Sequence, residues 1–146
     1  MVNKLFDARL HYENDFITRQ KIMIYFNNLG KKLTNNPDIY GIDLLEYDNG
    51  VVVAGYEIER RDNWEDGEFP FSTVHIPLRK IKFVCNSYAT YSITVNKKLT
   101  KALMINLWDV ISDKPVEVRN CYVSDGEEFL NIELSRFEVI DLSQVK

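Results

Sequence analysis

Two strand-like segments joined by a short turn restrict the fold of this chain more than any other feature of its sequence. Ile39–Tyr47 and Val51–Arg61 are rich in aliphatic, β-branched and aromatic residues. Between them, Asp48-Asn49-Gly50 has the residue types that reverse a chain tightly. The sequence therefore predicts a β-hairpin in the interior of the chain.

The length of the turn decides which side chains share a face of this hairpin. A two-residue Asn-Gly turn would pair Asp43 with Tyr56, whereas a three-residue loop with Gly50 left-handed would pair Asp43 with Gly55. We expect the three-residue loop, because it collects the apolar residues of the hairpin on one face. It also places Asp43 on the face that carries the charged residues of the second strand: Glu57, Glu59 and Arg61.

A helix is expected before the hairpin, from about Asp15 to Leu33, with Asn14 or Asp15 as its cap. Its apolar residues recur at helical spacing and form one stripe: Ile22, Phe26, Leu29 and Leu33. After the hairpin, Pro77 can start a short helix over Leu78–Val84.

The remaining segments are β-rich and read as two more hairpins and a last strand. The expected segments are Phe69–Ile76, Tyr88–Val95 with Ala102–Ile111, Val116–Val123 with Glu128–Leu134 around Ser124-Asp125-Gly126, and Phe137–Leu142. No internal repeat or Pro/Gly linker divides residues 1–146. The predicted fold is therefore a single α+β domain, a mixed β-sheet with an N-terminal helix and a short second helix.

Composition excludes several classes of protein. Hydrophobic residues make up 45% of the chain, which is ample for one core. Cys85 and Cys121 lack the spacing of a zinc or redox site, and we expect two reduced, mostly buried thiols. No apolar run reaches the roughly 18 residues of a membrane span, and the first ten residues carry charges where a signal peptide would be apolar. The sequence predicts a soluble protein in a reducing compartment.

The charges are unevenly distributed although the net charge is only −4. Phe69–Trp108 contains no Asp or Glu but six basic residues: Arg79, Lys80, Lys82, Lys97, Lys98 and Lys101. A basic segment beside an acidic remainder suits a protein that binds phosphates on one side and cations on another. A solvated lysine face with no partner is the alternative.

Three carboxylates on one hairpin face are costly to bury together unless something neutralises them. Asp43, Glu57 and Glu59 form this set, and Mg²⁺ (or Mn²⁺) prefers such oxygen ligands. Gly55 opposite Asp43 would leave space for a hydrated cation. Exposed edge-strand charges without a metal are the alternative explanation.

This arrangement resembles the core of the PD-(D/E)XK nuclease superfamily. The shared features are the first helix, the hairpin with Asp43 on one strand and Glu57-Ile58-Glu59-Arg60-Arg61 on the other, and the basic short helix. Gly55–Arg61, Phe69-Pro70-Phe71 and Val74-His75-Ile76-Pro77 look like the small phage-type members. The resemblance, over about Asn14–Ala102, implies a restriction-endonuclease-like core.

Site residues follow from the resemblance one by one. Asp43 matches the metal-binding aspartate, and the second acid is Glu57, with Glu59 at the lysine position, or Glu59, with Arg61 there. The usual lysine is missing in either case. Arg61 cannot act as a base, because it stays protonated, but it could stabilise a pentacovalent phosphate.

The resemblance also implies roles for residues outside the hairpin. Arg79, Lys80 and Lys82 on the short helix would contact the DNA backbone. Glu13 is a weaker match to an acidic position, and His75 is interpreted as structural rather than catalytic.

The leading functional hypothesis is a Mg²⁺- or Mn²⁺-dependent endonuclease or exonuclease that hydrolyses DNA phosphodiester bonds. A nuclease-like binding or assembly module that has lost catalysis is the alternative. By resemblance we expect a possible homodimer, and a location in the cytoplasm, or the host cytoplasm if the protein is viral.

Overall fold

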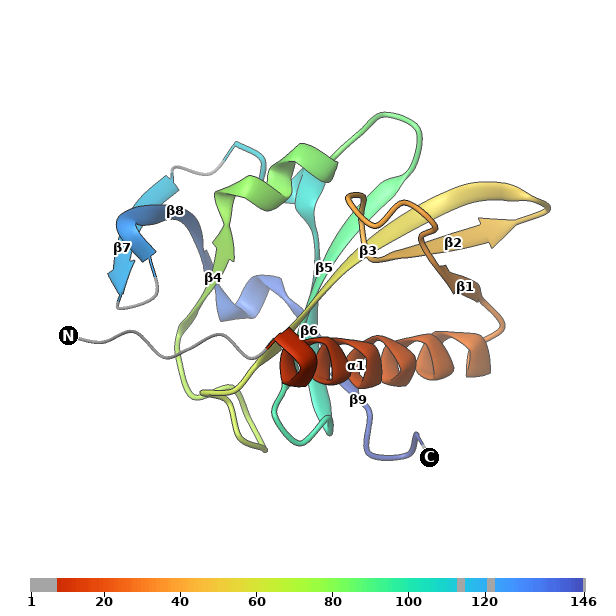
Figure 1. The fold of residues 1–146 in the computed structure, drawn as a ribbon, viewed down its shortest axis with the longest axis horizontal. Helices are drawn as coiled ribbons and strands as arrows, with labels where there is room; N and C mark the ends of the chain where they lie inside the picture. Colours follow the sequence, from red (N-terminus) through yellow and green to blue (C-terminus); the bar gives the residue numbers. More distant parts are fainter. Residues whose placement is uncertain (1–7, 113–114, 121–122, 146) are drawn as a thin grey trace.

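A six-stranded mixed sheet covered on one face by helix α1 (Ala8–Asn28) forms the centre of the fold (Figure 1). The computed structural model describes residues 8–112, 115–120 and 123–145, with side chains described for 15–112 and 128–145. Across the sheet the strands run β1 (Lys32–Asn35), β2 (Leu44–Asp48), β3 (Val51–Arg61), β5 (Ala89–Asn96), β6 (Lys101–Asn106) and β9 (Glu138–Asp141). Of these neighbours, β3 and β5 pair in parallel and the others are antiparallel.

The connection between the parallel strands β3 and β5 crosses the face of the sheet away from α1. It contains β4 (Thr73–Pro77) and the 3-10 helix η1 (Leu78–Phe83). A parallel pair requires such a crossover, because a tight turn can join only antiparallel strands. The expected α+β fold with a mixed sheet, an N-terminal helix and a short second helix is thus confirmed.

A second, three-stranded sheet lies on that same face. β4 pairs with β8 (Val123–Glu133), which pairs with β7 (Pro115–Asn120). The third expected hairpin therefore belongs to a separate sheet, and its turn is not at Ser124-Asp125-Gly126. These residues lie within β8, because Asn120 already pairs with Val123. The remaining 3-10 turns are η2 (Leu107–Asp109) and η3 (Leu134–Arg136).

Helix α1 begins and ends earlier than the sequence predicted. Gly30 has a φ of +88° and follows the helix. Lys31 N–H bonds to Phe26 O (3.1 Å) and Gly30 N–H to Asn27 O (3.0 Å), the Schellman pattern that ends a helix. Leu33 reaches the core from strand β1 instead, and Leu29 is 61% exposed. Since α1 starts at Ala8, Asn14 and Asp15 lie inside it and do not cap it.

The turn of the β2–β3 hairpin differs from the expected three-residue loop. Asn49 (φ 51°) and Gly50 (φ 77°) are both left-handed, and Asp48 pairs with Val51. This two-residue turn has a twist that matches the strands beside it. The expected pairing of Asp43 with Gly55 is therefore wrong, because Gly55 pairs with Leu45.

A β-bulge further along the hairpin nevertheless places Asp43 on the expected face, beside Glu57. Tyr47 pairs with Val52 but Glu46 pairs with Ala54, so Val53 is an extra residue. Beyond the bulge Leu44 pairs with Tyr56, which brings the preceding Asp43 next to Glu57. The predicted neighbours are thus correct although the predicted register is not.

Each face of the mixed sheet has its own apolar core. The core beneath α1 includes Ile22, Phe26, Leu44, Ala54, Tyr56, Ile93 and Val95. The core beneath the second sheet includes Val74, Ile76, Leu103, Ile105, Leu130 and Ile132. Strand β5 alternates between the two, because Ile93 and Val95 pack toward α1 while the equally buried Ser92 and Thr94 take the other face. Buried polar residues therefore line the face of β5 that is turned away from α1.

Two further expectations concern single elements. Strand β2 starts at Leu44 rather than at Ile39, because turns stabilised by Asn36 and Asp38 occupy the preceding segment. Cys85 is a free thiol, as expected, but it is half-buried rather than mostly buried, and Cys121 lies outside the described residues. Within the described part of the chain, no helix is both long and apolar enough to span a membrane.

Candidate functional site

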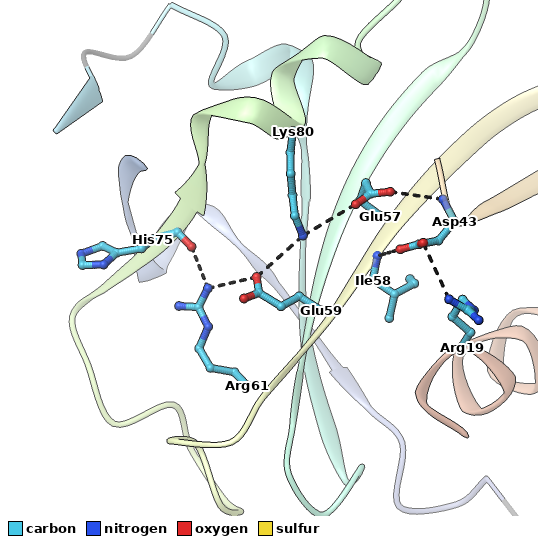
Figure 2. Close-up of polar contacts among 8 residues, drawn as sticks. All are labelled: Arg19, Asp43, Glu57, Ile58, Glu59, Arg61, His75 and Lys80. Atoms are coloured by element: carbon cyan, nitrogen blue, oxygen red, sulfur yellow. Dashed lines mark hydrogen bonds and ion pairs between the residues drawn. The ribbon is translucent and has the colours of Figure 1, made fainter. Parts of the chain in front are cut away.

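Asp43 and Glu57 come together where the hairpin opens away from its turn (Figure 2). The Asp43 amide donates to Glu57 Oε1 (3.2 Å), and the amide of Ile58 donates to Asp43 Oδ2 (2.9 Å). Both carboxylates are thus held by backbone groups of the opposite strand. The bulge at Val53 produces this arrangement, because it sets Asp43 beside Glu57 rather than beside Tyr56.

Lys80 of η1 reaches down into the same site. Its Nζ lies 3.8 Å from Glu57 Oε2 and 3.7 Å from Glu59 Oε2, and the residue is only 8% exposed. The sequence analysis placed Lys80 with Arg79 and Lys82 on one polar side of a short helix. A 3-10 helix has three residues per turn, so Arg79 and Lys82 share an exposed side while Lys80 points to the sheet.

Glu59 is engaged by two cations. Besides Lys80, Arg61 Nη2 donates to Glu59 Oε2 (3.2 Å) and also to the carbonyl oxygen of His75 on β4 (2.7 Å). His75 enters these contacts through its backbone, and its ring lies beside Phe129 with 5.8 Å between the centroids. Arg61 therefore ties the end of β3 to the second sheet.

Arg19 of α1 completes the cluster from the helix side. Its Nη1 lies 3.9 Å from Asp43 Oδ1, and within the described structure its Nε is buried without a hydrogen-bond partner. Arg19 was not among the site residues expected from the sequence. The spacing of Asp15, Thr18 and Arg19 was an available signal, since residues three and four apart share a helix face.

A polar pocket of about 340 Å³ lies over these side chains. Its walls come from three separate parts of the chain, namely α1, the β2–β3 hairpin and η1. The lining residues are Asp15, Thr18, Arg19, Asp43, Glu57, Ile58, Glu59, Arg60, Arg79 and Lys80. Most of the predicted site residues therefore meet at one cavity, together with several that the sequence analysis did not single out.

The two carboxylates at the centre are poorly suited to being ionised together. Burial, reinforced by the charge of Asp43, raises the pKa of Glu57 to about 7, while Lys80 acts in the opposite direction. Burial likewise raises the pKa of Asp43, against the lowering effects of the Ile58 amide and of Arg19. Additional positive charge between them would favour the doubly ionised pair.

The donor set at Asp43 and Glu57 fits a Mg²⁺-type ion. Such an ion keeps several of its waters and is commonly held by one or two carboxylates. Within the part of the chain that the structure describes, no group of three or more His, Cys, Asp and Glu side chains is arranged to hold a metal. The expected set of three carboxylates is thus divided, because Glu59 pairs with Lys80 and Arg61.

Gly55 does not leave the expected space for a cation. It lies opposite Leu45, and a Cβ at Gly55 would come within 2.9 Å of both Ile42 Cδ1 and Tyr88 Cε2. Two side chains fill the place where the sequence analysis expected a hydrated ion. The space beside Gly55 is therefore not available to a cation.

The basic residues of Phe69–Trp108 do not all lie at the pocket. Arg79 lines the pocket, and Lys82 is exposed with its Nζ 5.0 Å from the centre of the Phe83 ring. Lys97 pairs with Glu65 instead (3.8 Å), at the turn between β5 and β6. The basic residues of that turn are therefore partly balanced by the loop after β3. Glu13, the weaker acidic match, lies outside the residues whose side chains are described.

Comparison with known proteins supports the fold. No protein-family model and no curated protein matches the chain. Among solved structures, the chain is similar to Hjc, a Holliday junction resolvase from Archaeoglobus fulgidus, an archaeal hyperthermophile. The TM-score is 0.52 at 8% sequence identity, and the match covers 89% of this chain and 93% of that one. The chain therefore shares the nuclease-like α+β fold of this resolvase.

Proposed function

We propose that this protein is a metal-dependent nuclease that hydrolyses phosphodiester bonds in DNA. The observation that carries the proposal is the pairing of Asp43 and Glu57 in a polar pocket with the buried Lys80 beside them. The fold shared with a Holliday junction resolvase supports it, as does the resemblance of the hairpin and the basic helix to PD-(D/E)XK nucleases.

Asp43 and Glu57 are the proposed metal ligands. Their backbone hydrogen bonds fix both carboxylates before any ligand arrives, so binding orders few side chains. A divalent cation, when bound, supplies Lewis-acid stabilisation of the charge on the phosphoryl group. Glu59 holds Lys80 and Arg61 in place and is the third acidic member of the site.

We propose that Lys80 replaces the lysine that the motif on β3 lacks. Its ammonium group lies beside both Glu57 and Glu59, so a cationic donor is present although β3 carries none at the expected position. There it can donate a proton or a hydrogen bond to an oxygen of the reacting phosphate. Arg61 is held between Glu59 and His75 and keeps the proposed role of a charge-stabilising residue.

Arg19 and Arg79 are proposed to bind the phosphates of the DNA. Both line the pocket from opposite sides, and the buried Nε of Arg19 has no hydrogen-bond partner within the described structure. Guanidinium groups suit phosphate oxygens because they offer several donors in one plane. A soluble cytoplasmic enzyme that can form a homodimer remains our expectation.

Metal binding and DNA cleavage test the proposal directly. We expect Mn²⁺ or Mg²⁺ to raise the melting temperature of the wild type and to support cleavage of duplex, single-stranded or branched DNA. Asp43→Asn and Glu57→Gln should each lose both effects, because each replaces an anionic carboxylate with a neutral amide, a much weaker ligand for a divalent cation. Glu65→Gln, which changes an exposed carboxylate paired with Lys97, is the control and should keep both.

One observation favours the alternative of a non-catalytic module. Three cations, Arg19, Lys80 and Arg61, contact the three carboxylates, so the cluster is balanced without a metal. Such a protein would gain no stability from Mn²⁺ or Mg²⁺ and would cleave none of the three kinds of DNA. That combined result would replace the nuclease proposal with a binding or assembly function.

A further inference from the structure

A second pocket lies directly beside the carboxylate site. It has a volume of about 350 Å³ and shares Arg19 and Asp43 with the first pocket. Its other walls come from α1 and from the segment that precedes β2: Phe16, Asn35, Asn36, Asp38, Ile39, Gly41 and Ile42. The two pockets are therefore close enough for one ligand to occupy both, with a phosphate in the first and its neighbouring group in the second.

The segment that forms one wall is fixed by hydrogen bonds. Asn36 Oδ1 accepts from the amide of Asp38, and Asp38 Oδ1 accepts from the amide of Tyr40, both at 3.0 Å. The amide of Asn36 donates to Asp43 O (3.0 Å), which ties the segment to the carboxylate site. The segment nevertheless holds Ile39 83% exposed and Tyr40 84% exposed. An ordered segment that presents apolar side chains to solvent is organised for a ligand before it binds.

The lining of the second pocket suits a flat group with polar edges. Phe16, which is 40% exposed, and Ile39 offer apolar surface. Asn35 and Asp38 offer hydrogen-bonding groups around it. Nucleobases have both features, since proteins stack them on apolar or aromatic side chains and read their edges by hydrogen bonds.

We propose that this pocket binds an unpaired nucleobase adjacent to the phosphate that the enzyme cleaves. A base within a continuous duplex is stacked and paired, so it cannot enter the pocket unless it is flipped out, at a cost of a few kcal/mol. The substrate class is therefore DNA with an unpaired nucleotide beside the scissile bond, as in a flap, branch, bulge or single strand. This inference rests on the proposed function in one respect, namely that the scissile phosphate lies at the first pocket.

DNA binding without divalent cations tests the inference separately from cleavage. Fluorescence anisotropy would compare a continuous duplex, the same duplex with one unpaired nucleotide, and a third in which that nucleotide is abasic. We expect the unpaired base to tighten binding about tenfold, in line with the stacking of one base on a protein side chain. The abasic DNA should lose this gain, because it keeps the distorted backbone but has nothing to fill the pocket.

Variants locate the effect on the protein. Phe16→Ala and Ile39→Ala should abolish the preference for the unpaired base. Ile24→Ala is the matched control, because Ile24 lies on the same helix and is similarly exposed, at 38% against 40% for Phe16. It should keep the wild-type preference. All three changes are at exposed side chains, so we expect each variant to fold. Thermal melting verifies this before DNA binding is measured.

The possible outcomes separate this inference from the nuclease proposal. Equal affinity for the unpaired and the abasic DNA overturns the inference, and so does a preference that survives both Phe16→Ala and Ile39→Ala. Cleavage of DNA by the wild type would then still support the nuclease. A preference that depends on the base, on Phe16 and on Ile39 supports the base pocket, and a lack of cleavage with Mn²⁺ and Mg²⁺ would then overturn only the nuclease proposal and the assignment of the neighbouring phosphate as the scissile one.

Discussion

Lys80 Nζ lies 3.8 Å from Oε2 of Glu57, although one residue belongs to a 3-10 helix and the other to the central strand of the sheet. The contact places a buried cation next to the carboxylate that sits beside Asp43. It explains in part how three carboxylates can lie on one face of the hairpin, because Lys80 neutralises some of their charge. It also makes the chemistry of the site depend on the crossover between β3 and β5.

Replacing Lys80 with Met should lower stability, strengthen the stabilisation by Mn²⁺ and abolish DNA cleavage. The change leaves Glu57 and Glu59 without this cation, and breaking a buried ion pair costs about 3 kcal/mol of unfolding free energy. Mn²⁺ should stabilise the variant more than the wild type, because the site gains negative charge. DNA cleavage should nevertheless be lost. Urea denaturation, thermal melting with Mn²⁺ and a plasmid-nicking assay measure the three effects.

Lys98→Met is the control for this prediction, because Lys98 is exposed at the turn between β5 and β6. It should leave all three measurements near the wild-type values. Full cleavage activity in Lys80→Met would remove Lys80 from the proposed mechanism.

The stability of the metal-free protein should fall as the pH rises through the range in which Glu57 titrates. Burial raises the pKa of Glu57 to about 7, so the folded state holds this proton more tightly than the unfolded chain does. The stabilisation is complete below the ordinary pKa of 4.5 and is lost as the pH rises through about 7. Its size is at most about 3 kcal/mol.

Glu57→Gln isolates this contribution, because an amide does not titrate. In the absence of divalent cations, the variant should be more stable than the wild type at pH 8 and show a flatter dependence of unfolding free energy on pH. Urea denaturation between pH 5 and pH 8 measures both curves. Parallel curves for the two proteins would show that Glu57 does not have the raised pKa.

Arg79 should contribute to DNA affinity in a sequence-independent, salt-dependent way. Arg79→Gln removes one proposed phosphate contact, so affinity should fall for all DNA sequences alike. The slope of log K against log salt should become shallower by about 1. Lys82→Gln should behave in the same way if the predicted contact of Lys82 with the backbone is correct. Anisotropy titrations at several salt concentrations measure the slopes, and an unchanged slope in Arg79→Gln would exclude that contact.

Gly55→Ala should destabilise the protein and weaken metal binding at the same time. The new methyl group would lie 2.9 Å from Ile42 Cδ1 and from Tyr88 Cε2, and overpacking of this kind typically costs about 1–3 kcal/mol. Ile42 directly precedes Asp43, so its displacement should shift a metal ligand. Ile42→Val in the same chain removes one of the clashing methyl groups and should recover part of both losses. Urea denaturation and Mn²⁺ titration measure them, and unimpaired metal binding in Gly55→Ala would uncouple Asp43 from this packing.

The sequence by itself determined the elements whose signals are local. The aliphatic, β-branched and aromatic residues of Val51–Arg61 predicted β3 with its observed bounds, and Pro77 correctly placed the start of the short helix. Asn49-Gly50 predicted a tight turn, although its type was read incorrectly. The expected first helix extended beyond Gly30 to Leu33, because Leu33 continues the apolar spacing of the helix although it lies in a strand. Apolar spacing alone does not distinguish a side chain that reaches the core from a helix from one that reaches the same core from a strand.

Only the tertiary structure decided how the site is assembled. The bulge at Val53 moves Asp43 beside Glu57, and nothing local in Val51–Ala54 distinguishes a bulged strand from a regular one. Lys80 could not be assigned to the carboxylates from sequence, because its direction depends on the three-residue repeat of η1 and on the crossover above β3. Turn types and amphipathic faces follow from neighbours in sequence. Contacts between a helix, a hairpin and a crossover depend instead on how the sheet packs, which no short segment specifies.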